Sequence, residues 1–224
     1  MNGGKLTANE LYEQISGTSL FASKYPMLYQ YATPIKPMSR PLLGRDKELR
    51  QLRTGLLRPE LCNVLLLGDA GSGNTALVQG AMKSNSERIY VEIDLSKMIA
   101  DLRDPNEMAT RIKQLFENSQ LINKDSGMEI VLFMDEFHLV TMLSSAAVEA
   151  LKPMLADSGT RGIRVVAATT FSEFTQYIAA NQPLVQRLQR INITPPSADI
   201  TVSILGSFAQ QYGRGGAYSR NASI

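Results

Sequence analysis

The fold of this chain is decided by Val64-Leu65-Leu66-Leu67-Gly68-Asp69-Ala70-Gly71-Ser72-Gly73-Asn74-Thr75. A short apolar run leads into a glycine-rich turn, and a helical pattern begins at its end. Apolar runs of this length are typical of strands buried on both faces of a parallel sheet. A glycine-rich turn between such a strand and a helix points free backbone N–H groups, and the positive end of the helix dipole, at an anion. The stretch therefore predicts an α/β fold with a phosphate-binding loop.

The loop fits the pattern G-x-x-x-x-G-K-[ST] at every fixed position but one. Gly68 and Gly73 bracket four residues, and Thr75 offers a hydroxyl suited to Mg²⁺. Asn74 occupies the lysine position, where it brings no charge to the β and γ phosphates. The spacing favours a phosphate site over a purely structural turn. We expect weakened nucleotide binding and very slow hydrolysis.

Amino-acid composition and net charge limit the classes of protein to which the chain can belong. The chain has 224 residues, of which 44% are hydrophobic and 20% charged, as in an ordinary globular domain. Its 23 basic and 21 acidic residues give a net charge of +2, which is too balanced to favour nucleic acid or an anionic membrane as the main partner. Cys62 is the only cysteine, and no apolar run approaches the ~18 residues of a membrane span. We expect a cytoplasmic protein.

Strand and helix patterns alternate along the chain. Strands are expected at residues 63–67, 89–93, 129–134, 163–168 and 191–193, and helices at 44–57, 75–83, 106–118, 144–156 and 172–180. This alternation is typical of a parallel sheet with right-handed crossovers. We predict a three-layer α/β/α sandwich around a parallel sheet of about five strands, in a domain spanning residues 41–196.

Both ends of the chain differ from this domain. Residues 1–40 contain a capping-box pattern, Thr7-x-x-Glu10, followed by prolines at 26, 34 and 37, and Pro41 comes directly after them. Prolines at that density disfavour regular structure, so we expect an N-terminal arm or linker. After Pro196 one more helix begins, and residues 197–224 end in a polar tail. That helix either docks on the domain or begins a truncated second one.

A second apolar strand ends in two carboxylates, Asp135 and Glu136. Asp135 is suited to holding Mg²⁺, and Glu136 to polarising the water that attacks the γ-phosphate. His138 fits a local hydrogen-bonding role better than a catalytic one. The strand at 163–168 is followed by Thr170, which either senses the γ-phosphate or caps the next helix. Position alone does not separate these two roles.

Taken together, these residues resemble the first AAA+ module of the Clp unfoldases, the bacterial disaggregase and protease-partner ATPases. The similarity covers residues 41 to about 212 and follows family order through the segments 41–46, 68–75, 135–136, 151–155, 166–174 and 184–190. It implies a P-loop NTPase fold that binds ATP or ADP with Mg²⁺. It also implies that residues 197–212 begin the family's helical lid domain, cut short here.

The resemblance assigns roles to individual residues. Nucleotide contacts are implied for Leu43, Gly44, Asp69, Ala70, Gly71, Ser72, Gly73, Asn74, Thr75 and Ala76. Thr75 and Asp135 would hold the metal, and Glu136 would act on water. Thr170 takes the sensor position, and Arg187 takes the second of two arginine-finger positions. Because such a finger completes a neighbouring subunit's site, the resemblance implies a homo-oligomer, typically a hexameric ring, with a protein substrate or adaptor.

Three departures from the family pattern weaken different parts of an ATP-driven protein unfoldase. Asn74 replaces the loop lysine, Gln186 occupies the first finger position, and residues 102–107 lack the aromatic of a substrate-gripping pore loop. We therefore expect a module with a regulatory or structural role. The alternative is a working ATPase that unfolds proteins, with Lys47 or Lys83 supplying the missing charge. A DNA-acting AAA+ protein is disfavoured by the balanced charge and the absence of a basic helix.

Overall fold

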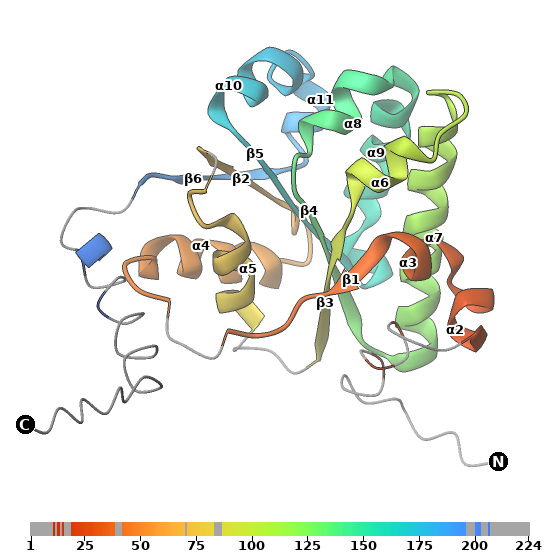
Figure 1. The fold of residues 1–224 in the computed structure, drawn as a ribbon, viewed down its shortest axis with the longest axis horizontal. Coiled ribbons are helices and arrows are strands. Elements are labelled where there is room, and N and C mark those ends of the chain that lie inside the picture. Colours follow the sequence, from red (N-terminus) through yellow and green to blue (C-terminus); the bar gives the residue numbers. More distant parts are fainter. Residues whose placement is uncertain are drawn as a thin grey trace, which may run out of the picture.

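The computed structural model describes residues 11, 13, 15, 19–38, 42–69, 71–82, 87–195, 200–202 and 206. One sheet runs through them, formed by β1 (Ala32–Pro34), β2 (Val64–Gly68), β3 (Arg88–Ile93), β4 (Glu129–Met134), β5 (Ile163–Thr169) and β6 (Gln189–Ile193). The strand order is β1-β3-β4-β5-β2-β6 (Figure 1). The five strands β2 to β6 are parallel, and β1 is antiparallel to β3. The predicted parallel sheet is confirmed, with β1 as an additional edge strand.

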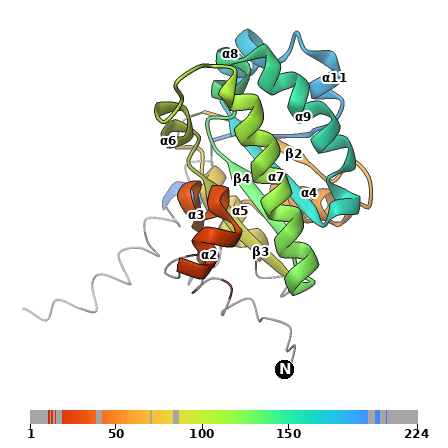
Figure 2. The same ribbon diagram turned by 90° about the vertical axis from the view of Figure 1, so that its right-hand side faces the viewer.

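Helices cover both faces of the sheet, so the predicted three-layer sandwich is also confirmed. The helices α4 (Asp46–Leu57) and α5 (Asn74–Met82) lie on one face, and α7 (Glu107–Ser126) and α9 (Ser145–Asp157) on the other (Figures 1 and 2). Shorter elements follow the strands: α6 (Leu95–Ala100), α8 (His138–Leu143), a 3₁₀ turn (Gly159–Arg161), α10 (Phe171–Glu173), a π-helical turn (Phe174–Ile178) and α11 (Gln182–Val185). Along β2, Leu65 and Leu67 join one apolar core, while Val64 and Leu66 join the other. This two-sided burial explains the unbroken apolar run.

The helix α7 is longer than expected, because the sequence pattern predicts its end near residue 118. It continues to Ser126 and stops at Gly127, whose φ of 72° is the left-handed conformation of a helix C-cap. The Gly127 N–H donates to the Asn123 carbonyl at 2.8 Å. Two short helices, α6 and α8, have no counterpart in the sequence prediction.

The expectation that the proline-rich N-terminal segment lacks regular structure is wrong for residues 26–34. The helices α2 (Ser19–Lys24) and α3 (Pro26–Tyr31) precede β1 in this segment. Pro26 stands at the first position of α3, where the missing N–H costs nothing, and Pro34 ends an edge strand. Leu28 and Tyr31 are buried against the main core. Residues 19–34 therefore form part of the folded body. Thr7, Glu10 and Pro41 lie outside the described residues.

Replacing Leu28 by alanine should destabilise the whole domain by about 2–5 kcal/mol, because the side chain is 1% exposed within the main core. The exposed Leu20 of the same segment, at 78%, serves as the matched control, and Leu20→Ala should change stability by less than about 0.5 kcal/mol. Urea unfolding measures both variants. A loosely attached arm would instead give equal, near-zero changes for the two substitutions.

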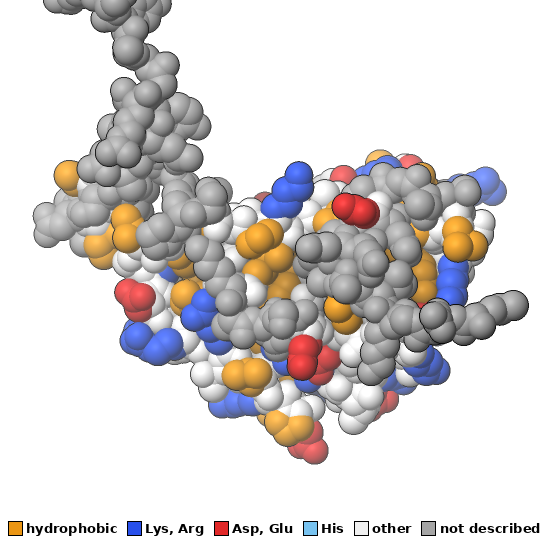
Figure 3. Space-filling view, turned by 90° about the horizontal axis from the view of Figure 1, so that it is seen from below, with side chains coloured by type: hydrophobic (Ala, Val, Ile, Leu, Met, Phe, Trp, Pro, Cys, Tyr) orange, Lys and Arg blue, Asp and Glu red, His pale blue; other side chains and the backbone are white. Residues whose placement is uncertain are grey.

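At the other end, residues 200–202 and 206 are helical, and the remaining residues after 195 lie outside the described set. Among the described residues, no helix combines the length and hydropathy needed to span a membrane. On the face viewed from below, the visible hydrophobic side chains alternate with charged ones (Figure 3).

Candidate functional site

The glycine-rich loop follows the buried strand β2 and leads directly into α5. Gly71 and Gly73 have φ values of 77° and 96°, which residues with a side chain rarely adopt. A Cβ added at either would meet no atom within 4 Å, so the front of the loop is open. A Cβ at Gly68 would lie 2.5 Å from Ser72 Oγ, so the back of the loop is closely packed. Ala70 lies outside the described residues.

Asn74 begins α5, and its side chain is turned toward the loop itself. The Ser72 hydroxyl donates to Asn74 Oδ1 at 3.3 Å. One cation nevertheless holds the loop from behind: Arg45, 8% exposed, donates from Nη2 to the Ser72 carbonyl at 2.8 Å. Its Nη1 donates to the Thr194 carbonyl at 2.6 Å, so Arg45 ties the loop to the end of β6. No local sequence pattern indicates this role of Arg45.

The strand order brings the predicted site residues to one edge of the sheet. The strand β5 lies between β4 and β2, so Asp135 and the glycine loop are separated by two strand spacings, roughly 10 Å. Thr170, directly after β5, lies between them in this order. Asp135, Glu136, Thr170 and the loop therefore share the carboxyl edge of the sheet, where ligands bind in open α/β folds.

The acidic pair is held in a strained turn. Asp135 is half-buried and accepts the Glu136 N–H at 3.0 Å, while Glu136 has a left-handed φ of 52°. Burial raises the pKa of Asp135, and the nearby charge of Glu173 adds to the rise. Burial also raises the pKa of Glu136, and Glu173 and Asp135 contribute. The site thus gathers carboxylates whose repulsion a bound cation would relieve.

His138 and Glu173 complete this cluster, and the sequence analysis gave Glu173 no role in the site. His138 Nδ1 lies 3.2 Å from Glu173 Oε2 and 3.5 Å from Glu136 Oε2. It also lies 3.2 Å from Thr169 Oγ1, so His138 has the local hydrogen-bonding role expected of it. Ligand atoms of the three residues Glu136, His138 and Glu173 lie within 4.8 Å of one another. The capping-box spacing Thr170-x-x-Glu173 is the sequence pattern that could have indicated a role for Glu173.

Thr170 caps the short helix α10. Its Oγ1 accepts the Glu173 N–H at 3.2 Å, and Glu173 Oε2 accepts the Thr170 N–H at 3.1 Å. Although burial works to raise the pKa of Glu173, hydrogen bonds from Thr170 and Thr169 bring it below its ordinary value. The capping alternative is therefore confirmed. Capping uses the Thr170 hydroxyl oxygen as an acceptor, so the hydroxyl proton can still be donated to a phosphate. The sensor role of Thr170 therefore stays a prediction.

A cavity of about 420 Å³ opens beside the acidic pair, at the ends of β3 and β4. Four carboxylates line it: Glu92, Asp94, Asp135 and Glu136. Burial raises the pKa of Glu92, with further contributions from the charges of Asp135 and Asp94. This side of the site attracts cations, whereas the open glycine loop presents N–H groups to anions.

Leu43 and Gly44 lie on the approach to α4. Gly44 has a φ of 68°, and a Cβ at this position would lie 2.5 Å from Ile200 Cγ2. The neighbouring Leu42 packs on the core that α4 and α5 share. These residues stand next to Arg45, which contacts the loop. The segment assigned to nucleotide contact is thus connected to the phosphate loop.

Arg187 is not brought to this site. It lies two residues before β6, whose first residue, Gln189, is opposite Val64 at the beginning of β2. The loop follows the other end of β2, and the strand spans about 16 Å. Arg187 Nη1 donates to the Pro183 carbonyl, and its buried Nε has no partner among the described residues. Arg187 therefore cannot serve the loop of its own chain.

Comparison with known proteins identifies the family of this chain. Residues 64–195 match the family described as "ATPase family associated with various cellular activities (AAA)". The chain belongs to the AAA family. The match runs from the first residue of β2 to two residues beyond β6, and so includes the loop, the acidic pair and Thr170.

Relatives of this AAA module are Clp-type chaperones. The chain is 32% identical over 209 residues to chaperone protein ClpB 2 of Nostoc sp., covering 84% of this chain and 23% of that protein. It is 30% identical over 214 residues to ClpB of Rickettsia conorii, covering 85% and 24%. The chain thus spans about a quarter of the length of these relatives. The module is of the AAA+ Clp type.

Solved structures show the same fold. A structure of the S. cerevisiae Hsp104:casein complex in its extended conformation aligns with a TM-score of 0.66 at 25% identity, covering 84% of this chain and 34% of that one. A structure of the S. cerevisiae Hsp104-ADP complex aligns with a TM-score of 0.65 at 26% identity, covering 78% and 31%.

The residues of this AAA module fit a magnesium nucleotide. The front of the loop is open at Gly71 and Gly73, and α5 points its N-terminus there. Asp135 keeps acceptor capacity beyond its one backbone hydrogen bond. Thr75 and Ala76 lie in the first turn of α5, directly after the loop, and both are half-buried. The described part of the loop leaves room for phosphates, and position 74 holds a neutral side chain where the motif has a cation.

Proposed function

We propose that this chain is a Clp-type nucleotide-binding module that holds ATP or ADP with Mg²⁺ and hydrolyses ATP slowly. One observation carries the proposal: an open glycine loop at the N-terminus of α5 has the neutral Asn74 where the cation belongs. Thr75 and Asp135 would hold Mg²⁺, and Glu136 would orient water. The bound Mg²⁺ would neutralise phosphate charge, and the chain's own residues would position it. The solved relative with ADP supports the choice of nucleotide.

The role of the module would be regulatory or structural inside a protein-remodelling ring in the cytoplasm. Arg187 stands at the sheet edge opposite the loop, so we assign its charge to a neighbouring subunit's nucleotide and not to that of its own chain. Gln186 beside it is exposed and neutral. This arrangement supports a homo-oligomer, or a ring shared with competent subunits, with a protein substrate or adaptor and without nucleic acid or membrane. The relative solved with casein supports a protein substrate.

A second candidate is an active ATPase that drives protein unfolding. The intact acidic pair favours it, as does the charge of Arg45 on the loop. Of the two residues considered for the missing charge, Lys47 lines a groove between α4 and β6, and Lys83 lies outside the described residues. Neither gains support as a substitute for the loop lysine.

Calorimetric titration with Mg-ATP and steady-state hydrolysis test the proposal. We expect saturable, magnesium-dependent binding and turnover far below about 1 per second. Asp135→Asn should abolish the magnesium dependence, since it removes the charge that holds the metal. Asp157→Asn, at an exposed ion pair with Arg161, is the matched control and should leave binding unchanged.

Two outcomes would contradict the proposal. Absence of any nucleotide binding would overturn the assignment of the loop. Turnover near 1 per second would establish the second candidate instead. Sedimentation of the same samples, with and without ATP, tests the ring, and a monomer in every condition would leave Arg187 without a nucleotide to reach.

A further inference from the structure

A polar groove runs between α4 and the outer edge of β6. It consists of two adjoining cavities of about 660 and 340 Å³. Both are lined by Lys47 and Gln51 of α4 and by Arg190 and Ile191 of β6. The cavities together follow β6 from Gln189 past its last residue to Thr194. The groove is therefore as long as the strand.

The strand β6 offers unpaired backbone groups to this groove. It is the last strand in the sheet order and pairs only with β2 among the described residues. The Gln189 N–H donates to the Asn63 carbonyl on the β2 side at 2.9 Å. Since backbone groups alternate in direction along a strand, Arg190 and Asn192 point their N–H and C=O groups outward. Both residues are exposed.

The groove is strongly basic. Lys47, Arg50, Arg58 and Arg190 line it, and none of them has an ion pair among the described residues. Arg190 lies 5.8 Å from the centre of the Phe174 ring, on the face of the sheet opposite α4, so it borders the groove at the edge of β6 while its side chain points to the other face. The one carboxylate among the described lining residues, Glu48, lies 3.5 Å from Arg45.

We propose that this groove docks an extended acidic segment of a partner protein, which adds a strand to the edge of β6. Unpaired edge groups bind a peptide backbone by strand addition, and Lys47, Arg50 and Arg58 on the α4 side select acidic side chains. The five residues of β6 span about 17 Å, the length of a five-residue extended segment. Docking of a peptide in this groove does not require nucleotide binding.

Two other occupants fit the groove less well. A second copy of this chain pairing through its own β6 would bring Arg190 and Lys47 of both copies together, and like charges repel. A nucleic acid would meet the cations, but its phosphates only accept hydrogen bonds and so cannot pair with the outward carbonyls of Arg190 and Asn192. An acidic peptide satisfies both the charges and the backbone groups.

The charge requirement is tested with a fluorescein-labelled heptapeptide of alternating glutamate and valine, by fluorescence anisotropy. We expect saturable binding that Lys47→Glu combined with Arg50→Glu weakens at least tenfold. Lys113→Glu with Lys124→Glu makes the same change of charge on exposed positions of α7 and should leave the affinity unchanged. Equal binding of a heptapeptide with lysine in place of glutamate would overturn the proposal.

The strand-addition requirement is tested by amide hydrogen exchange. The peptide should slow exchange at Arg190 and Asn192, whose N–H groups face outward, and leave Gln189 and Ile191 unchanged. Asn192→Pro removes an outward donor and should weaken binding about tenfold, whereas Asn192→Ala should not. Unchanged exchange at Arg190 and Asn192 would overturn the proposal. So would tighter binding of an oligo(dT) strand than of the peptide, or dimerisation that Asn192→Pro abolishes.

Discussion

Asn74→Lys is expected to tighten Mg-ATP binding by about 10- to 100-fold, because it restores a charge-assisted hydrogen bond worth roughly 1.5–3 kcal/mol. The neutral side chain at this position now accepts from the Ser72 hydroxyl, which a lysine would release. A lysine at the start of α5 would project its ammonium group into the open front of the loop, where phosphates would lie. Calorimetric titration of Mg-ATP into both proteins measures the change.

Hydrolysis should rise as well, but by less than a complete site would allow. Glu136 is present to orient water, while Gln186 still leaves one of two finger positions without a charge. Adding Gln186→Arg to Asn74→Lys should therefore raise turnover further, and only under conditions in which the chain oligomerises. Asn106→Lys, at an exposed N-cap position with no side-chain hydrogen bond, controls for added net charge. If Asn74→Lys left the affinity unchanged, another group would already supply the charge, as the second candidate requires.

The parts of this fold that the sequence predicts well are those whose information is local. The strands β2, β4 and β5 are buried on both faces, and each contains an apolar run, at residues 64–67, 130–134 and 165–168. The glycine loop is equally local, since Gly71 and Gly73 supply the left-handed conformations that the turn needs. The acidic pair follows directly from the end of β4. Position along the chain is enough to recognise all of these features.

The missed features depend on residues far apart in the sequence. Arg45 contacts Thr194, which is 149 positions away in the sequence, and no local sequence pattern predicts that contact. His138 meets Thr169 only because β4 and β5 are neighbours in the sheet. The prediction that the N-terminal segment lacks regular structure is wrong for a different reason. A proline count treats all prolines alike, whereas Pro26 and Pro34 occupy the two positions where proline is tolerated.

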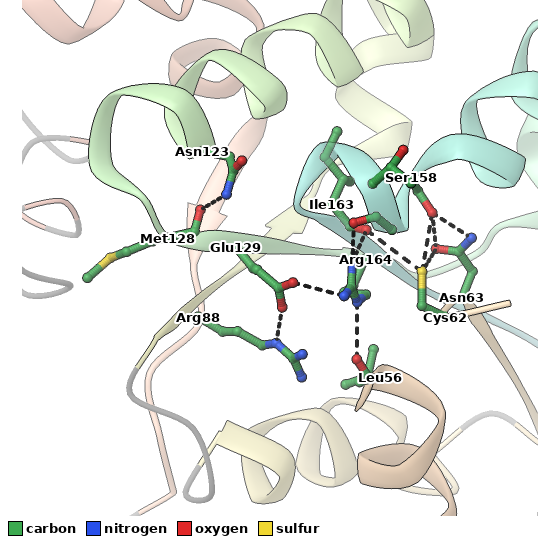
Figure 4. A network of polar contacts seen from close by, with 12 residues as sticks. Leu56, Cys62, Asn63, Arg88, Asn123, Met128, Glu129, Ser158, Ile163 and Arg164 are labelled. Atoms are coloured by element: carbon green, nitrogen blue, oxygen red, sulfur yellow. Dashed lines mark hydrogen bonds and ion pairs between the residues drawn. The ribbon is translucent and has the colours of Figure 1, made fainter. Parts of the chain in front are cut away.

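At the edge of the sheet opposite the site, one carboxylate holds two buried arginines. Glu129 Oε2 accepts from Arg88 Nε at 2.6 Å, and Glu129 Oε1 accepts from Arg164 Nη2 at 2.8 Å (Figure 4). Arg88 and Arg164 are 8% and 5% exposed. Arg164 Nε also donates to the Leu56 carbonyl at the end of α4 at 3.1 Å. The pairs therefore join β3, β4, β5 and α4 at the amino-terminal edge of the strands.

Glu129→Gln should destabilise the domain by about 3–5 kcal/mol, because it leaves two buried guanidinium groups without a counter-charge. Glu149→Gln makes the same change at an exposed pair with Lys152 and should cost less than about 1 kcal/mol. Urea unfolding of both variants supplies the two values. Replacing Glu129, Arg88 and Arg164 together by leucine or methionine should recover much of the loss, since the cost lies in the unpaired charges and not in the lost attraction. A loss below 1 kcal/mol for Glu129→Gln would show that water already screens the pair, despite the burial of both arginines.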